Sequence, residues 1–340
     1  MPATAPDLVV AVTGPTGTFG FGLMPLLQSE ARVARVIGIA RRPFDPAEHG
    51  WTKMVYRQGD VRDPAGLEEA FRGADVVVHL AFLITGTSSL DTLRAVNVDG
   101  TLNALRAAAA AGATRFVFAS SVAAYGFHAD NPLGMTEDWP VRPAERLFYA
   151  QEKAELEALL GEAAEEHPGL DLYLLRPSIV LGPHTVGAKQ VPRALGALGR
   201  GFAAVVDRSP VRLPAPAPSL PVQFVHEDDV GSALVRCVLG AGPPGAYNIA
   251  GDGVLSASDV FREMGLRPVT VPGALARGPA RLVAALAALP FAPPATTWAE
   301  AVSHPAIMDT AKAKRELGWR PAYTGLEALR ATLGGRRPRR

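Results

Sequence analysis

Cysteine is almost absent from the sequence. Its single cysteine, Cys237, excludes an internal disulfide and lies in an apolar stretch, so we expect a buried structural thiol in a protein of the reducing cytoplasm. An excess of charge of either sign is also missing, with 34 Lys and Arg against 33 Asp and Glu. A net charge of +1 gives no field that would attract nucleic acid or an anionic membrane. We therefore expect a small-molecule partner.

Long apolar runs are missing as well. The Ala-rich stretches at 102–111 and 282–289 fall far below the roughly 20 residues that cross a bilayer. The N-terminal segment has no cationic stretch followed by an apolar run, so we expect neither export nor membrane insertion. His128 and His184 have no partners at metal-ligand spacing, and we assign no metal.

Short apolar runs alternate with helical patterns in the first half of the chain. Strands are expected at 8–13, 36–40, 55–58, 76–80 and 116–119. Helices are expected at 21–30, 64–71, 92–111 and 148–166. This alternation predicts an α/β fold with a doubly wound parallel sheet of the Rossmann type.

The pattern changes from about Gly182, where Pro and Gly become dense and the regular alternation is lost. Helices are expected near 190–200, 228–239, 256–264 and 274–289, with strands around 222–225 and 247–249. We predict a dinucleotide-binding domain over 1–181 and a smaller, mixed substrate-binding region over 182–335, with some crossing of the chain between them.

Glycines recur at a spacing of three directly after the first expected strand. A turn of this kind lets the backbone approach a pyrophosphate closely at the N-terminus of the next helix. An ordinary strand-to-helix connection is the alternative. The cofactor contacts predicted from this turn are Gly14, Thr16, Gly17, Thr18, Phe19 and Gly20.

The ends of the next expected strands carry further candidate cofactor contacts. Arg41 and Arg42 stand at the end of the second expected strand, where NAD-selective dinucleotide-binding proteins place an acid. An arginine there can pair with the 2′-phosphate of NADP(H), so we expect NADP(H) to be favoured, with NAD(H) as the alternative. The alternative is that both arginines point to solvent and do not contact a cofactor. The remaining candidates are Asp60 and Val61 beside the adenine, and Leu80, Ala81 and Phe82 at the carboxyl end of the fourth strand.

Tyr149 and Lys153 are spaced by four residues and lie on one face of an expected helix. A nearby ammonium favours the phenolate and so lowers the pKa of a tyrosine. Such a tyrosine can exchange a proton with a substrate oxygen while hydride moves to or from a nicotinamide. Ser121, which leaves the fifth strand, could bond the same oxygen. A half-exposed tyrosine beside a solvated lysine is the alternative.

At this point the sequence resembles the extended short-chain dehydrogenase/reductase superfamily, in the NAD-dependent epimerase/dehydratase group. The resemblance covers residues 8 to about 330. It rests on the glycine turn, Asp60-Val61, His79-Leu80-Ala81, Asn97 to Thr101, Ser120-Ser121 with Tyr125-Gly126, Tyr149 with Lys153, and Arg176-Pro177 with Gly182-Pro183.

The resemblance implies a role for each of several residues. Ser121, four residues before Tyr125, is the catalytic hydroxyl, and Tyr149 is the acid/base. Lys153 also bonds the nicotinamide ribose, and Asn97 supports a proton-relay water, a helix cap being its alternative. Pro177 joins the cofactor contacts. A homodimer through the helices 92–111 and 148–166 is usual in this family.

Two departures from the family pattern argue against particular reactions of the family. Val122 and Ala123 stand where dehydratases carry Asp and Glu, and 178–180 offers no amide for a sugar diphosphate. The sequence favours an NAD(P)-dependent oxidoreductase acting on an alcohol or ketone. A nucleotide-sugar 4-epimerase is the first alternative. The second is a non-catalytic cofactor-binding regulator, against which the complete set of Ser121, Tyr149 and Lys153 argues.

His226 to Val230 and Glu137 to Trp139 are two acidic segments whose sequences leave their roles open. The first matches a family segment that borders the substrate pocket, but Asp228 or Asp229 is equally suited to cap a helix. The second precedes Tyr149 and could line the pocket or form a solvated loop.

Overall fold

The protein is described by a computed structural model over residues 7–84, 89–145, 147–185, 214–218, 220–271 and 304–333. Its centre is a seven-stranded sheet in the order β11-β6-β5-β4-β1-β2-β3, with every neighbouring pair parallel. The strands are β1 (Leu8–Thr13), β2 (Val33–Ala40), β3 (Met54–Gln58), β4 (Val76–His79), β5 (Arg115–Ala119), β6 (Asp171–Pro177) and β11 (Gly245–Ile249). The predicted Rossmann-type fold is thus confirmed. The order in which the strands are added reverses between β1 and β4, and sheets of this kind bind ligands at such a point, beyond the carboxyl ends of their strands.

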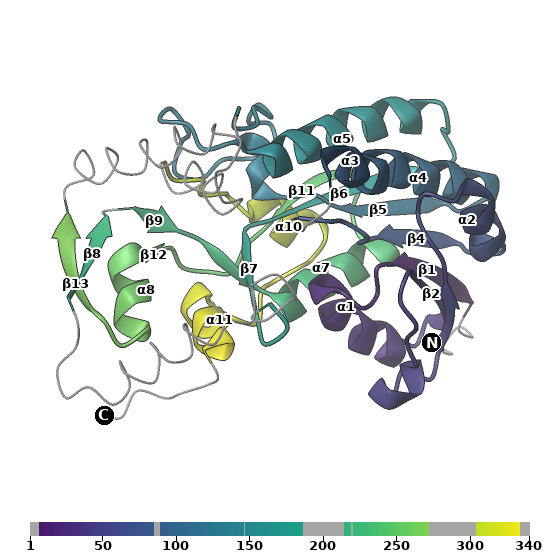
Figure 1. The fold of residues 1–340 in the computed structure, drawn as a ribbon, viewed down its shortest axis with the longest axis horizontal. Coiled ribbons are helices and arrows are strands. Elements are labelled where there is room, and N and C mark those ends of the chain that lie inside the picture. The colour runs from purple at the N-terminus through teal and green to yellow at the C-terminus, as the bar shows by residue number, and fades with distance from the viewer. Residues whose placement is uncertain are drawn as a thin grey trace.

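Helices cover both faces of the sheet (Figure 1). On one face lie α1 (Thr18–Ser29) and α7 (Glu227–Val238), and on the other lie α2 (Pro64–Phe71), α4 (Gly100–Ala110) and α5 (Phe148–Glu165). Side chains along β1 point alternately to the two faces of the sheet, so this strand contributes to the hydrophobic core on each face. Val10 and Val12 pack on the α1 side, and Ala11 packs on the side of α2 and α4. The sheet is therefore buried on both sides, as its continuously apolar strands require.

A π-helical turn interrupts the long helix expected over 92–111. The chain forms α3 (Leu90–Arg94), then the π turn η2 (Ala95–Asp99), then α4. Ser89 caps α3 by accepting from the Thr92 amide at 3.3 Å. Such turns inside helices are frequent at functional sites, and this one carries Asn97.

The remaining elements are short and lie mostly in the C-terminal half. Three two-stranded sheets pair β7 (Ile179–Leu181) with β10 (Phe224–His226), β9 (Pro221–Val222) with β12 (Leu255–Ser256), and β8 (Pro214–Pro218) with β13 (Arg267–Val271). The other described elements are α8 (Ala257–Glu263), α10 (Ala311–Glu316), α11 (Gly325–Thr332) and the 3-10 turns η1 (Pro46–His49) and η3 (Val122–Tyr125). The helices expected near 190–200 and 274–289 lie outside the described residues.

Helices α1 and α7 touch main chain to main chain. A Cβ on Gly22 would lie 2.2 Å from the Glu227 carbonyl oxygen, and one on Gly231 would lie 2.2 Å from the Gly22 carbonyl oxygen. The two glycines are therefore required by the helix crossing itself.

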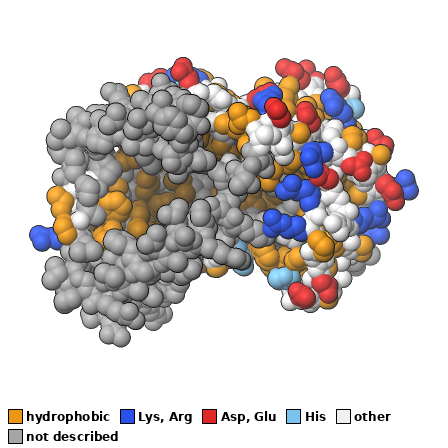
Figure 2. Space-filling model, viewed as in Figure 1, with side chains coloured by type: hydrophobic (Ala, Val, Ile, Leu, Met, Phe, Trp, Pro, Cys, Tyr) orange, Lys and Arg blue, Asp and Glu red, His pale blue; other side chains and the backbone are white. Residues whose placement is uncertain are grey.

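On the molecular surface, acidic and basic side chains are intermixed over the half that carries the large sheet (Figure 2), in keeping with the near-zero net charge. Among the described helices none is both long and apolar enough to span a bilayer.

Candidate functional site

The three glycines of the turn after β1 differ in how closely other atoms approach them. Gly14 has a φ of +69°, and a Cβ there would lie 2.9 Å from the Ala81 nitrogen. A Cβ on Gly20 would lie 2.1 Å from the Pro15 carbonyl oxygen. At Gly17 a Cβ would meet only the Gly14 carbonyl oxygen, at an ordinary 3.4 Å. The protein's own packing therefore does not require glycine at 17.

The other cofactor contacts predicted here lie in the turn itself or at the start of α1. Thr16 lies within the turn, Gly17 is the N-cap of α1, and Thr18 and Phe19 are the first two residues of the helix. The N-cap is a glycine, so no N-cap side chain accepts a hydrogen bond from the amides of the first turn.

The loop after β2 places both candidate arginines at the surface. Arg41 and Arg42 are exposed. Their main-chain carbonyls are held by the neighbouring strand: the Gln58 amide donates to the Arg41 oxygen at 3.0 Å, and the Tyr56 hydroxyl donates to the Arg42 oxygen. The loop backbone is thus fixed while the guanidinium groups stay accessible.

Asp60 is engaged within the protein. The Arg62 guanidinium donates to both its oxygens, at 3.0 and 2.7 Å, and these bonds, with a contribution from the charge of Arg41, hold the pKa of Asp60 below its usual range. Val61 is buried, and a Cβ on Gly100 would lie 2.5 Å from its side chain. Asp60 therefore remains ionised at neutral pH as a hydrogen-bond acceptor.

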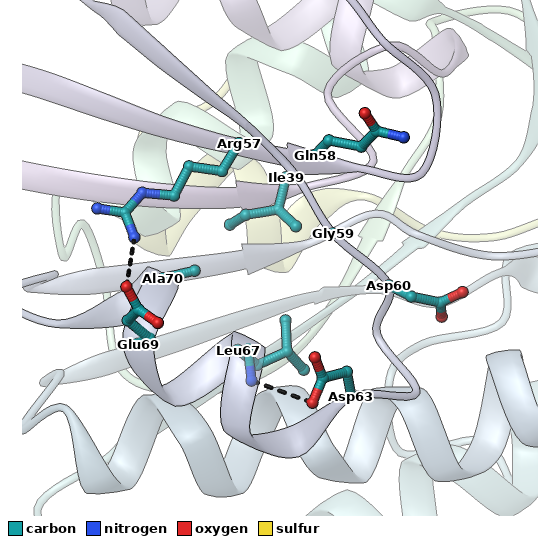
Figure 3. A pocket seen from close by; sticks show the side chains of 10 residues that line it. Ile39, Arg57, Gln58, Gly59, Asp60, Asp63, Leu67, Glu69 and Ala70 are labelled. Carbon is teal, nitrogen blue, oxygen red and sulfur yellow. Dashed lines mark hydrogen bonds and ion pairs between the residues drawn. The ribbon is translucent and has the colours of Figure 1, made fainter.

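Asp60 lines a pocket of about 240 Å³ between α2 and the ends of β2 and β3 (Figure 3). The Arg57 and Glu69 side chains, 4.0 Å apart, meet at the end away from Asp60. Neither Ser121, Tyr149 nor Lys153 lines this pocket, so it is separate from the candidate reactive groups.

The structure brings Ser121, Tyr149 and Lys153 together. Ser121 follows β5 and accepts from the Ala123 amide at 3.1 Å. Tyr149, in the first turn of α5, lies close enough to Ser121 for the Ser121 side chain to affect its pKa. The Lys153 ammonium, one turn further on, donates to the Ala119 carbonyl at 2.7 Å. All three groups therefore lie at the carboxyl end of β5.

Burial dominates the acid–base properties of these groups. It raises the pKa of Tyr149, with Ser121 acting in the opposite direction. It lowers the pKa of Lys153 to about 7, against the charges of Glu157 and Glu152. The sequence had suggested an ammonium that lowers the tyrosine pKa, and the structure differs because the Lys153 nitrogen is 5.9 Å from the Tyr149 ring centre and bonded elsewhere.

Phe82, at the end of β4, packs against both residues. The Lys153 nitrogen lies 3.6 Å from the Phe82 ring centre, and the Tyr149 ring meets Phe82 edge to face at 5.7 Å. Ala81 lies against Gly14, and Leu80 packs at the edge of the core on the α1 side. The residues predicted at this strand end thus lie between the glycine turn and the candidate reactive groups.

Asn97 lies inside the π turn rather than at a helix N-cap. Its side-chain oxygen accepts from the Leu83 amide at 2.8 Å, and its nitrogen donates to the Leu83 carbonyl at 2.9 Å and to the Glu152 carboxylate at 2.7 Å. Its side chain therefore ties the segment after β4 to α5.

A buried relay that the sequence did not reveal supports the π turn. His79 lies between the hydroxyls of Thr13 and Thr101, at 2.9 and 3.0 Å, and burial lowers its pKa to about 3. The Leu80 amide donates to Thr13, so the network assigns the neutral tautomer in which Thr13 donates to Nδ1 and Nε2 donates to Thr101. Thr101 in turn donates to the Asn97 carbonyl at 2.5 Å.

A buried ion pair beneath the site was also missed. Glu157 and Arg176 lie 2.5 Å apart, Ser120 donates to Glu157, and Arg176 donates to the Tyr125 hydroxyl at 2.6 Å. The spacing of Tyr149, Lys153 and Glu157 by four residues each was the available signal, because it places all three on one face of α5. Pro177 follows Arg176 at the end of β6.

The two acidic segments make structural contacts. His226, rather than an aspartate, caps α7 by accepting from the Asp228 amide at 3.2 Å. Asp229 accepts from the amides of Ala322 and Tyr323. Glu137 accepts from the Asn248 amide at 2.8 Å. Within the described parts of the chain, no group of His, Cys, Asp or Glu side chains is arranged to hold a metal ion.

Comparisons with known proteins agree with this architecture. The model of the NAD dependent epimerase/dehydratase family matches residues 10–250. The uncharacterized protein y4nG of Sinorhizobium fredii is 28% identical over 94% of this chain and 76% of its own length. The ceramide reductase of Caulobacter vibrioides is 30% identical over 67% of this chain and 60% of its own length. The structure of MoeE5 in complex with UDP-glucuronic acid and NAD is 25% identical, with a TM-score of 0.68 over 96% of this chain and 97% of MoeE5.

Proposed function

Because the chain belongs to the NAD-dependent epimerase/dehydratase family, we propose that it is an NAD(P)-dependent oxidoreductase acting on an alcohol or ketone. The observation that carries this proposal is the position of the three groups: Ser121 follows β5, the buried Lys153 donates to the last carbonyl of β5, and Tyr149 lies one helical turn before Lys153. A relative that bears the name ceramide reductase supports the redox assignment.

The proposed reaction uses the three side chains in different ways. The bound nicotinamide supplies or accepts the hydride. Ser121 donates a hydrogen bond to the substrate oxygen, and Tyr149 exchanges a proton with it. Since burial raises the pKa of Tyr149, the phenol is protonated at neutral pH and suited to act as the acid in ketone reduction. Lys153 bonds the ribose, and Asn97 holds the neighbouring segment for a relay water.

The cofactor would lie along the carboxyl ends of the strands. The glycine turn, with Thr16, Thr18 and Phe19, would hold the pyrophosphate, Asp60 and Val61 the adenine, and Leu80 to Phe82 with Pro177 the nicotinamide side. Arg41 and Arg42 are accessible on a fixed loop. Their guanidinium groups suit a 2′-phosphate, so we propose a preference for NADP(H).

A nucleotide-sugar 4-epimerase is the second candidate, favoured by the likeness to MoeE5, whose structure contains UDP-glucuronic acid. Against it, Ile179 and its neighbours provide no amide for a diphosphate, and Ile179 is an exposed apolar residue at the start of β7. Val122 and Ala123, both buried and apolar, provide no acid or base for a dehydratase.

Identification of the cofactor that copurifies with the protein, by mass spectrometry, is the first step of the test. The purified protein is then given cyclic ketones with reduced cofactor and, separately, UDP and dTDP sugars. Loss of nicotinamide absorbance that depends on the ketone supports the oxidoreductase. Inversion of a sugar at C4 with no net change in absorbance, or micromolar affinity for either sugar in saturation-transfer NMR, would promote the epimerase instead.

A further inference from the structure

A small cavity of about 60 Å³ lies beyond the carboxyl ends of β5 and β6. Val122, the residue after Ser121, forms part of its wall, and Ser178, the residue after β6, forms another part. The cavity therefore has walls formed by the residues that follow Ser121 and β6 in the chain.

The described lining of this cavity contains no charged side chain of Asp, Glu, Lys or Arg. Most of it is apolar, and both polar atoms of the Gln223 side chain already bond to Met308: the nitrogen donates to the carbonyl at 3.1 Å and the oxygen accepts from the amide at 3.0 Å. His304 has an interaction of its own. Apart from His304, the described walls offer no cationic side chain to a phosphate or carboxylate.

Ser178 differs from the other polar residues that line the cavity, because its side chain has no hydrogen-bond partner. The residue is 5% exposed, yet its hydroxyl oxygen is buried without any hydrogen-bond partner. Buried hydroxyls nearly always have a partner, because leaving one unpaired costs stability. Ser178 lines a cavity, so a group bound there can supply the missing bond.

We propose that this cavity receives a short, uncharged substituent of the substrate, which carries one hydroxyl or carbonyl oxygen that Ser178 binds. A hydroxyl both donates and accepts, which admits either oxygen. The volume is that of on the order of four water molecules, so only a few heavy atoms enter. This inference rests on the proposed function, because Ser121 marks the position of the reacting oxygen.

Two cyclic ketones of similar shape test the inference, 4-hydroxycyclohexanone and 4-methylcyclohexanone. We expect Ser178→Ala to lower kcat/KM for the hydroxylated ketone about tenfold and to leave the methylated ketone unchanged, since one neutral hydrogen bond is lost. Ser178→Thr keeps the hydroxyl and should restore the preference. Ser29→Ala, at an exposed serine near the end of α1, is the matched control.

Thermal unfolding separates recognition from structural support. Because the Ser178 hydroxyl has no partner within the protein, Ser178→Ala should leave Tm unchanged or raise it. A clear fall in Tm would assign the hydroxyl a structural role and overturn the inference.

Saturation-transfer NMR with 4-hydroxycyclohexanone distinguishes this inference from the proposed function. Turnover that falls equally for both ketones in Ser178→Ala overturns the inference and leaves the oxidoreductase standing. Binding that depends on Ser178 without turnover supports the cavity assignment and counts against the oxidoreductase. Absence of both binding and turnover overturns both.

Discussion

Lys153→Met should stabilise the unliganded protein at neutral and acidic pH, and the gain should shrink as the pH rises. The Lys153 side chain is 3% exposed, and burial lowers its pKa from 10.5 to about 7. Between these values the unfolded chain binds more protons than the folded chain, so the free energy of unfolding rises with pH. The difference between the two pKa values means that burying the charged Lys153 costs the folded protein on the order of 5 kcal/mol below pH 7. Methionine is never charged, so the variant does not lose this stability.

Guanidinium unfolding of both proteins at intervals from pH 6 to pH 10 measures this effect. Loss of the Lys153 bond to the Ala119 carbonyl costs about 1 kcal/mol at every pH, so it shifts the difference without changing its slope. Lys312→Met is the matched control, since Lys312 also donates to a carbonyl and lies over an aromatic ring but is only half-buried. A difference between wild type and Lys153→Met that stays constant with pH would refute the reasoning.

Three further experiments test the candidate site by substitution. Tyr149→Phe should lower turnover at least 100-fold while cofactor affinity stays nearly unchanged; a residual rate above about a tenth of wild type would contradict the acid/base role. Gly17→Val should abolish cofactor binding in calorimetry with the fold retained, whereas Gly20→Val should disturb the fold itself, because its Cβ would lie 2.1 Å from a carbonyl oxygen. Arg41→Ala with Arg42→Ala should weaken NADP(H) binding about 10- to 100-fold and NAD(H) little; equal wild-type affinities for the two cofactors would rule out recognition of the 2′-phosphate.

The sequence predicted best those features that depend on nearby residues. The helix α2 has the bounds expected for it, and the first five strands lie within a few residues of the expected ranges. Spacing by four correctly placed Tyr149 and Lys153 on one side of α5. Each of these features follows from apolar periodicity or from a turn, which are local properties of the chain.

Features that depend on distant partners were missed. Strand β6 was not expected, because its short apolar run between a long helix and a Pro-rich segment shows no period of its own. The π turn breaks a sequence whose helical pattern is continuous, and a buried relay from His79 supports it. Glu152 and Glu157 look like solvated helix residues, yet their burial is decided by Asn97 and Arg176, which lie far along the chain.

The place of β11 in the sheet limits how this protein can be divided or recombined. β11 comes from the C-terminal half, yet it pairs with β6 and completes the edge of the large sheet. Val225, Tyr247 and Trp319 belong to the same core as Val10 and Val12. A polypeptide ending at residue 181 would leave β6 as a bare edge and invite pairing between molecules. A chimera must therefore keep α7, β11 and Trp319 together with the N-terminal half.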